Sequence, residues 1–344
     1  MKAAIYYGVR DIRIAERPVP DADNGGILLQ VEACAICGSD IRTFLSGNAH
    51  VTPPRVLGHE VCGVIRSVPT VSSEDLKVGD RVTVAPAIGC GSCRECQSGS
   101  PNMCANLRTV GFEYDGGFAE YMLVPREAYL NVVKVPDGLS SEYATLAEPL
   151  ACCINGQEQV GIALGDSVVV IGAGPIGCMH VVLAKLRGAA SVIAVDTVSQ
   201  RLVVANEVGA TRTICSSNED PVASVLELTG QLGADVVIVA CASAEAQVQA
   251  LQMCSRRGRV LLFGGLPPGR VASIDTNLVH YRQILVTGSH ASTALQNKLA
   301  VQLLASGTIP AEKLLTHTEP LERIREVFAS AMSAAQMKIA IRPN

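Results

Sequence analysis

The stretch Val168-Val-Val-Ile-Gly172-Ala-Gly174-Pro-Ile-Gly177 decides how the second half of this chain folds. A continuous apolar run leads into three glycines with the spacing G-x-G-x-x-G, and the helix-like segment Ile176–Leu186 follows. The glycines alone are a weak signal, but between a strand and a helix they indicate a dinucleotide-binding turn. Gly172 allows the tight bend, Gly174 lets a pyrophosphate approach the backbone, and Gly177 lets the helix pack on the strand. The helix N-terminus offers unpaired N–H groups to the phosphates.

Asp196, at the end of the next apolar run, Val192–Val195, indicates which dinucleotide binds. A carboxylate at this place accepts hydrogen bonds from the adenosine ribose hydroxyls, and its charge repels a 2′-phosphate. The sequence therefore predicts NAD rather than NADP. The alternative for Asp196 is an ordinary helix N-cap. Arg201 is expected either over the adenine or on the solvated face of its helix.

Apolar runs alternate with helix-like segments from about residue 160 onward. Two more runs are Val236–Ala240 and Val260–Phe263, and a second helix-like segment is Gln200–Val208. This alternation predicts an α/β fold with a doubly wound parallel sheet that is covered on both faces. A last apolar strand, Ile284–Gly288, is expected at the sheet edge, and exposed edges of this kind usually pair.

The first 150 residues have a different sequence pattern, in which short β-like runs alternate with glycine and proline. The runs are Ile27–Val31, Val61–Val68, Arg81–Ala85 and Phe118–Val124. They predict a β-rich domain. After about residue 292 come two helix-like stretches and a strand, namely Leu295–Ser306, Leu321–Ala335 and Met337–Ile341.

With 344 residues, the chain is too long for one ordinary core. We expect a β-rich domain over 1–151, a dinucleotide-binding domain over 152–292, and a segment over 293–344 that returns to the first domain. The net charge of −4, without a basic run, argues against nucleic acid as a partner. Neither a signal peptide nor a membrane span is evident, and thirteen cysteines suggest reduced thiols in a cytoplasm.

Four cysteines, Cys90, Cys93, Cys96 and Cys104, follow the spacing C-x2-C-x2-C-x7-C. Four thiolates this close in sequence can surround one tetrahedral zinc ion and leave no position for water, which is typical of structural zinc sites. A disulfide pair or buried core cysteines would be the alternative, but the gaps match metal binding better than core periodicity. The lobe at about 88–106 is therefore expected to hold a structural zinc.

A second set of metal-ligating residue types precedes the dinucleotide-binding stretch. Cys37 lies in Cys-Gly-Ser-Asp, His59 and Glu60 in Gly-His-Glu, and Glu148 in Glu-Pro-Leu. Thiolate, imidazole and carboxylate all bind zinc, and three protein ligands leave a fourth position for water or substrate. These residues are therefore candidates for a catalytic zinc site.

Taken in order, these motifs resemble the zinc-dependent medium-chain dehydrogenase family over essentially the whole chain. The shared motifs are Cys37-Gly-Ser-Asp, Gly58-His-Glu-x-x-Gly63, the four-cysteine lobe, Asp115-Gly-Gly-Phe-Ala-Glu-Tyr121, Glu148-Pro-Leu and Gly172-x-Gly-x-x-Gly177. The chain is most similar to the polyol branch, which includes sorbitol, threonine and galactitol-phosphate dehydrogenases. The resemblance implies a GroES-like catalytic domain built from both ends of the chain, with a Rossmann domain between them, in a homodimer or homotetramer.

The resemblance further implies reversible oxidation of a secondary alcohol by NAD, assisted by one catalytic zinc, with a second, structural zinc per chain. Cys37, His59 and Glu148 or Glu60 would hold the catalytic zinc, and a cysteine ligand at Cys152 or Cys153 stays an alternative. Ser39 would pass on the hydroxyl proton, and Asp40 would orient His59. The cofactor-binding residues so implied are Gly172, Gly174, Pro175, Ile176, Gly177, Asp196, Arg201, Gly264 and Ser289.

Two departures from the family bear on the substrate. Many relatives carry a histidine where this chain has Arg42, and a guanidinium stays charged and cannot ferry protons. Either solvent completes the proton relay or His50 takes the place of the missing histidine. Alternatively, Arg42 binds an anionic substrate group such as a phosphate, or it is a surface residue without a role in the site. Sorbitol dehydrogenases have an arginine and an aromatic residue where Ala291 and Ser292 stand, which argues against sorbitol itself.

Other functions remain to be weighed against a polyol dehydrogenase. L-threonine and a polyol phosphate are alternative substrates within the same branch. A non-catalytic NAD-binding protein is the alternative from a different class, and its signature would be the loss of metal ligands, all of which are present here.

Overall fold

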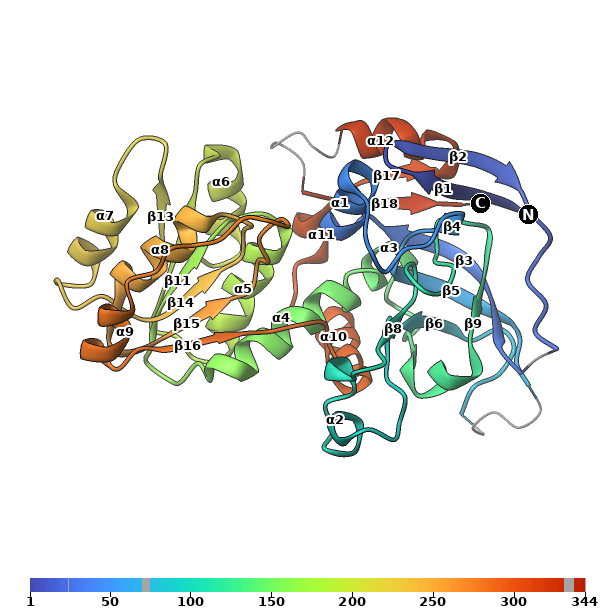
Figure 1. Cartoon of the computed structure of the whole chain (residues 1–344), viewed down its shortest axis with the longest axis horizontal. Helices are drawn as coiled ribbons and strands as arrows, with labels where there is room; N and C mark the ends of the chain where they lie inside the picture. The colour runs from blue at the N-terminus through green and yellow to red at the C-terminus, as the bar shows by residue number, and fades with distance from the viewer. Residues whose placement is uncertain (24, 70–74, 331–336, 344) are drawn as a thin grey trace. The chain divides into compact units, whose positions relative to one another are not determined.

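The computed structural model describes residues 1–23, 25–69, 75–330 and 337–343. The chain forms two compact units, the first made of residues 1–151 with 291–344 and the second of residues 152–290 (Figure 1). Helix α4 (Ala147–Val160) carries the chain from the first unit into the second. None of the helices in the described ranges has the length and apolar character needed to cross a membrane.

The second unit is built on one parallel sheet of six strands, in the order β13-β12-β11-β14-β15-β16. Its elements in chain order are β11 (Ser167–Ile171), α5 (Pro175–Leu186), β12 (Ser191–Asp196), α6 (Ser199–Glu207), β13 (Arg212–Cys215), α7 (Pro221–Leu228), β14 (Ala234–Val239), α8 (Ala244–Met253), β15 (Cys254–Leu262), α9 (Thr276–Arg282) and β16 (Leu285–Gly288). The order reverses between β11 and β14, which is the doubly wound topology of dinucleotide-binding folds. The expectation of such a sheet is confirmed.

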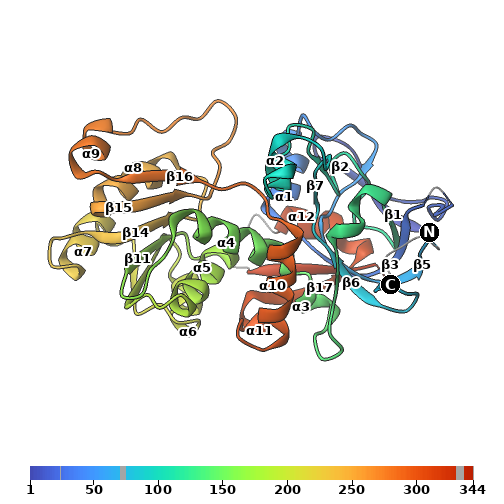
Figure 2. The same ribbon diagram turned by 90° about the horizontal axis from the view of Figure 1, so that it is seen from below.

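Helices cover both faces of this sheet, which explains why its strands are apolar without alternation. Figure 2 shows α5 and α6 on one side and α8 and α9 on the other. The central strands β11 and β14 bury Val169 and Val237 completely. Strand β16 lies at one edge of the sheet, as expected, and its Leu285 side chain is exposed.

The first unit is rich in β-structure, with a sheet of seven strands, one of three (β2-β1-β4) and one of two (β7-β8). Its elements are β1 (Lys2–Gly8), β2 (Asp11–Glu16), β3 (Ile27–Ala35), α1 (Gly38–Ser46), β4 (Arg55–Val56), β5 (Glu60–Ser67), β6 (Arg81–Val84), β7 (Ala87–Ile88), α2 (Arg94–Gln97), β8 (Arg108–Thr109), β9 (Tyr121–Val124), β10 (Val132–Lys134), α3 (Ser141–Ala144), α10 (Ala294–Ala305), α11 (Ala311–Leu314), β17 (Leu315–Pro320), α12 (Ile324–Ser330) and β18 (Lys338–Arg342).

Strand β3 is the centre of the large sheet, because it pairs antiparallel with β5, β9 and β18. The pairing with β18 joins the last strand of the chain to one of the first, through Ala340 opposite Ala35 and Ile341 opposite Cys34. Alternate residues of β3 point into a core that includes Leu29, Phe118 and Phe328, all fully buried.

The expected elements and the observed ones differ mainly at their ends. The strand expected at Phe118–Val124 is shorter, since regular pairing begins at Tyr121. The helix expected over Leu321–Ala335 begins with a 3-10 turn, Leu321–Arg323, before α12, and its last part lies outside the described residues. The four apolar runs of the doubly wound sheet all form strands.

The glycine-rich turn between β11 and α5 shows which of its glycines the fold requires. Gly172 has φ of +99°, a conformation that residues with a side chain rarely adopt. A Cβ on Gly177 would lie 1.7 Å from the carbonyl oxygen of Gly172, whereas a Cβ on Gly174 would meet nothing within 4 Å. The first and third glycines are thus required by the fold, while the middle one leaves open space above the turn.

We therefore expect Gly177→Ala to lower the free energy of unfolding by about 3 kcal/mol or more, because α5 must move off β11. Gly174→Ala is the matched control and is expected to change this free energy by less than about 1 kcal/mol. Urea unfolding followed by circular dichroism measures both. Equal stability of the two variants would contradict the close approach of α5 to β11.

Candidate active site and metal centres

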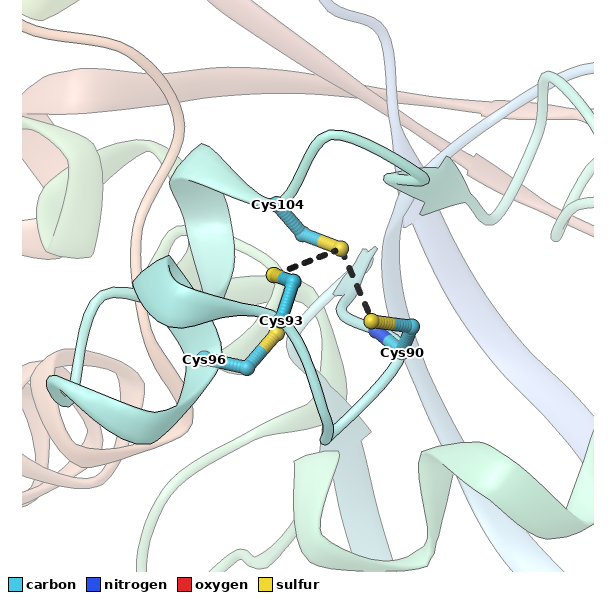
Figure 3. Close-up of side chains that lie close together, drawn as sticks. All are labelled: Cys90, Cys93, Cys96 and Cys104. Atoms are coloured by element: carbon cyan, nitrogen blue, oxygen red, sulfur yellow. Dashed lines mark hydrogen bonds between the residues drawn. The ribbon is translucent and has the colours of Figure 1, made fainter.

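The four cysteines of the predicted zinc lobe come together in one group, as Figure 3 shows. Cys96 lies in α2, Cys90 and Cys93 precede it, and Cys104 follows a 3-10 turn. The four sulfur atoms lie within 4.8 Å of one another. The Sγ atom of Cys104 accepts hydrogen bonds at 3.3 Å from the backbone N–H groups of Cys90 and Asn106.

This group fits a tetrahedral zinc ion. Hydrogen bonds from the backbone and side chain of Ser92 are the main cause that lowers the pKa of the Cys90 thiol, to about 6. Desolvation and the neighbouring thiols raise the pKa of Cys96 to about 12. Four thiolates in one place repel one another, and a divalent cation among them removes this repulsion.

Cys37, His59 and Glu60 form a second group, in which one ligand atom of each lies within 4.8 Å of the others. The register of β3 with β5 causes this, since Glu60 lies opposite Ala35 at the end of the strand pair. Cys37 lies two residues after the end of β3 and is the N-cap residue of α1. In the sequence Cys37 lies more than twenty positions before His59 and Glu60, and the strand pairing brings it close to them.

Asp40 is fully buried beside this group and contacts the residues around it. Its carboxylate accepts hydrogen bonds from the backbone N–H of Cys37, at 3.0 Å, and of Gly58, at 3.3 Å. It also lies 3.5 Å from His59 Nδ1, which leaves the other ring nitrogen, Nε2, at 3.4 Å from Ser39 Oγ. The imidazole is thus oriented with Nδ1 toward Asp40 and Nε2 toward Ser39.

The charges around this group favour an ionised thiol. Burial by itself would raise the pKa of Cys37, but His59 and Lys338 lower it to about 7. Burial lowers the pKa of His59, while Asp40 and Cys37 outweigh it and raise that pKa well above the usual value. The second oxygen of Glu60, Oε2, is buried and has no hydrogen-bond partner among the described residues. A thiolate, an imidazole and an unsatisfied carboxylate oxygen match the donor set of a catalytic zinc.

Glu148 lies in the first turn of α4 and is 9% exposed. Glu148 is not part of the group formed by Cys37, His59 and Glu60, but its negative charge contributes to raising the pKa of both Glu60 and Lys338. Of the alternative cysteine ligands, Cys153 is buried and its Sγ lies 3.8 Å from the carbonyl oxygen of Ile176. Cys152 is half-buried.

The two candidate substrate residues are both exposed. Arg42 lies on α1, and His50 lies in the loop after that helix. The Nδ1 atom of His50 is 3.3 Å from Glu113 Oε1, so its side chain is engaged in an ion pair when protonated.

Two residues of this site were not expected from the sequence. Phe112 packs edge-on against His59, with ring centroids 5.7 Å apart. Lys338, from β18, donates a hydrogen bond to Glu60 Oε1 at 2.6 Å. A lysine next to the apolar run Ile339–Ile341 of the terminal strand is a signal that points to Lys338. Nothing in the pattern around Phe112 marks that residue.

A pocket of about 590 Å³ in the second unit opens where the sheet order reverses, beside the ends of β11, β12 and β14. Gly172, Asp196 and Arg201 line it. The Asp196 carboxylate accepts hydrogen bonds from the backbone N–H of Ala173, at 2.6 Å, and of Val198, at 2.9 Å. Such a place at the carboxyl ends of parallel strands is where doubly wound folds bind nucleotides.

Further acidic residues, Glu219, Asp220 and Glu245, also line this pocket and were not expected from the sequence. Together with Asp196 they outnumber its one arginine, Arg201, whose Nε atom is buried and has no hydrogen-bond partner within the described ranges. The excess of carboxylates disfavours a ligand with an additional phosphate at this end.

The other residues expected to bind the cofactor lie around the same strand ends. Pro175 and Ile176 begin α5. Gly264 follows β15, and its backbone N–H donates to the carbonyl oxygen of Val239 at 2.8 Å. Ser289 follows β16.

Comparison with known proteins gives the same fold and chemistry. Residues 23–137 match the alcohol dehydrogenase GroES-like domain, and residues 175–306 match the zinc-binding dehydrogenase domain. The sorbitol dehydrogenase of Bacillus subtilis is 32% identical, covering 100% of this chain and 98% of the relative. The D-arabitol-phosphate dehydrogenase of Enterococcus avium is also 32% identical, over 98% and 95%. A solved structure of a putative zinc-binding dehydrogenase from Sinorhizobium meliloti, bound to NADP, is 34% identical with a TM-score of 0.93, covering 99% of both chains.

The chain belongs to the zinc-binding dehydrogenase family with a GroES-like domain. It is an oxidoreductase that acts on CH–OH groups of small molecules with a nicotinamide cofactor.

We expect the purified protein to hold two zinc ions per chain, one at each cysteine-containing group. Cys93→Ser should remove one ion and lower the free energy of unfolding by about 2 kcal/mol or more, because structural zinc contributes to folding. Cys37→Ser should remove the other ion and abolish activity with little loss of stability. Mass spectrometry of the metals measures this, and Cys215→Ser, outside both groups, is the control. One zinc per chain in the unaltered protein, held by the four-cysteine lobe alone, would contradict a zinc-dependent enzyme.

Proposed function

We propose that this chain is a zinc-dependent dehydrogenase that interconverts a secondary alcohol of a polyol or sugar alcohol and the corresponding ketone, with NAD as the hydride acceptor. The observation that carries this proposal is the grouping of Cys37, His59 and Glu60 at the end of β3. A half-buried thiol of lowered pKa, an oriented imidazole and an unsatisfied carboxylate oxygen together suit a Lewis-acid metal that activates a hydroxyl group.

In this proposal Cys37, His59 and Glu148 or Glu60 hold the catalytic zinc, while the lobe of four cysteines holds the structural one. Zinc bound at the first site makes the hydroxyl group of the substrate more acidic. Ser39 Oγ takes the hydroxyl proton and passes it on toward solvent. Asp40 keeps the His59 ring in one orientation through Nδ1.

The cofactor is proposed to bind over the glycine-rich turn, with its phosphates at the N-terminus of α5 and its adenosine in the 590 Å³ pocket. The residues assigned to it are Gly172, Gly174, Pro175, Ile176, Gly177, Asp196, Arg201, Gly264 and Ser289. The carboxylates of the pocket favour NAD, although the Sinorhizobium meliloti relative was solved with NADP.

Asp196→Asn removes the charge and keeps one accepting oxygen, so that one of the two backbone hydrogen bonds to this side chain is lost together with the charge. We expect the ratio of kcat/KM for NADP to that for NAD to rise about tenfold or more, which corresponds to about 1.4 kcal/mol of relieved repulsion. Steady-state kinetics with both cofactors measures the ratio. Glu245→Gln, from the same pocket, is the matched control and should change it less. A wild-type preference for NADP would refute the NAD assignment.

The substrate class depends on Arg42. Its exposed guanidinium is suited to bind a phosphate or carboxylate group, and one relative is a D-arabitol-phosphate dehydrogenase. A phosphorylated polyol is therefore the second candidate substrate, and L-threonine is the third.

NADH formation by the zinc-loaded protein, with free polyols, phosphorylated polyols and L-threonine, separates these candidates. If phosphorylated polyols react best, Arg42→Ala should raise their KM about tenfold or more and leave free polyols unaffected. The control is Arg66→Ala, a surface arginine that bonds Gln30. If free polyols react best and Arg42→Ala changes nothing, Arg42 is a surface residue. No oxidation of any alcohol would refute the proposed function.

Assembly and compartment are also proposals. We infer a homodimer or homotetramer, supported by the position of β16 at the edge of the sheet and by its exposed Leu285. Thirteen cysteines, of which five belong to the two proposed zinc sites, support a reducing compartment such as the cytoplasm.

A further inference from the structure

The dinucleotide-binding unit has a second pocket, at the amino ends of the strands whose carboxyl ends form the cofactor pocket. This amino-end pocket has a volume of about 780 Å³. Its lining includes Ser167 and Ser191, which begin β11 and β12, and Asp235 near the start of β14. Since a strand rises about 3.3 Å per residue, the five residues of β11 hold this place about 16 Å from the glycine-rich turn. Both pockets can therefore be occupied at once, and the proposed reaction uses only one of them.

Two guanidinium groups line the amino-end pocket, those of Arg256 in β15 and Arg282 at the end of α9. The Nη1 atom of Arg256 donates to the carbonyl oxygen of Tyr281 at 3.4 Å. The Nη1 atom of Arg282 donates to the carbonyl oxygens of Cys254, at 3.2 Å, and Gln252, at 3.5 Å. Over the part of the chain that the structure describes, the Nε and Nη2 atoms of both arginines make no hydrogen bond, and neither arginine pairs with a carboxylate. Both positive charges are thus left without a counter-charge.

Asp235 is the one carboxylate among the described residues that line this pocket, and it is already engaged. Its Oδ2 atom accepts hydrogen bonds from the backbone N–H of Ser167, at 2.9 Å, and from the hydroxyl group of the same serine, at 2.7 Å. The amino-end pocket therefore has two arginines against one carboxylate, whereas the cofactor pocket has four carboxylates against one arginine. An anion is favoured in the first and disfavoured in the second.

Exposed leucines form the apolar part of the lining. Leu228 is 47% exposed and Leu232 is 78% exposed, and both line the pocket together with the arginines. The turn that carries Leu232 is closely packed, since a Cβ on Gly233 would lie 2.7 Å from the carbonyl oxygen of Met253. An apolar surface on a packed turn beside unpaired cations is suited to a ligand that has both an apolar body and a negative charge.

We propose that the amino-end pocket binds a small organic anion, with its phosphate or carboxylate group at Arg256 and Arg282 and its apolar body over Leu228 and Leu232. The unused Nε and Nη2 atoms of a guanidinium group can donate two parallel hydrogen bonds to such a group. The volume is in the range of small-molecule sites. The proposal does not depend on the proposed function, because none of these residues belongs to the zinc sites or to the cofactor pocket.

Octyl phosphate has both chemical features and is the probe. Isothermal titration calorimetry of the full chain, with NAD in excess to fill the cofactor pocket, is expected to show one binding site. Inorganic phosphate, which lacks the apolar body, should bind about tenfold more weakly or less. Arg256→Gln should weaken the binding of octyl phosphate about tenfold, because charge-assisted hydrogen bonds are lost. Leu232→Ser should weaken it about threefold, because apolar contact is lost.

Residues of the same type outside the pocket supply matched controls. Arg257→Gln changes the next arginine in the sequence, which is exposed and is not among the lining residues. Leu164→Ser changes a leucine that is 90% exposed elsewhere in the same unit. Both variants should bind octyl phosphate as the unaltered protein does. Arg42→Ala tests whether the probe has entered the proposed substrate site instead, and it should leave the affinity unchanged.

Absence of saturable binding of octyl phosphate to the unaltered protein would overturn the proposal. Equal losses of affinity in Arg256→Gln and Arg257→Gln would overturn it as well, because they would indicate unspecific attraction to surface charge. A loss of affinity in Arg42→Ala would place the probe in the substrate site and have the same consequence. Binding to phosphatidylglycerol vesicles without binding of octyl phosphate would assign this face to a lipid surface and refute a small-molecule site.

Discussion

The hydrogen-bonded pairing of strand β3 on both sides is the interaction on which the candidate active site depends. Strand β5 on one side brings His59 and Glu60, and β18 on the other brings Lys338, to the point where β3 ends at Ala35. Cys37 lies two residues further on as the N-cap residue of α1, where the helix N-terminus favours a negative charge. The register of three strands thus fixes the positions of the groups that carry the chemistry.

Burial makes these groups interdependent. Asp40 and Glu60 are fully buried and Lys338 nearly so, so that each charge requires an opposite charge within hydrogen-bond reach. The Asp40 carboxylate pairs with His59, and the Lys338 ammonium pairs with Glu60. The pKa of the Cys37 thiol is lowered. The same low-dielectric surroundings that make an unpaired charge costly make a bound divalent cation favourable beside a thiolate and a carboxylate.

The dinucleotide-binding unit depends on a constraint of a different kind, namely the close approach of two backbones. The first turn of helix α5 can pack this closely on the preceding turn only because Gly177, which lies against the carbonyl oxygen of Gly172, has no side chain. The space next to Gly174, at the N-terminus of the helix, stays open. Four carboxylates line the pocket beside this turn, those of Asp196, Glu219, Asp220 and Glu245. The carboxylates after β13 and in α8 come from distant parts of the sequence.

The sequence by itself determined the doubly wound sheet, the glycine-rich turn, the zinc lobe and the identities of Cys37, His59, Glu60 and Asp196 as site residues to be tested. These signals are local, since they depend on hydrophobic periodicity and on spacings of a few residues. Only the tertiary structure decided that Lys338 and Phe112 lie at the same site and that Glu219 and Glu245 join Asp196. The physical reason is that strand register and helix packing join residues far apart in the chain, and neither periodicity nor spacing records which strand becomes the neighbour of β3.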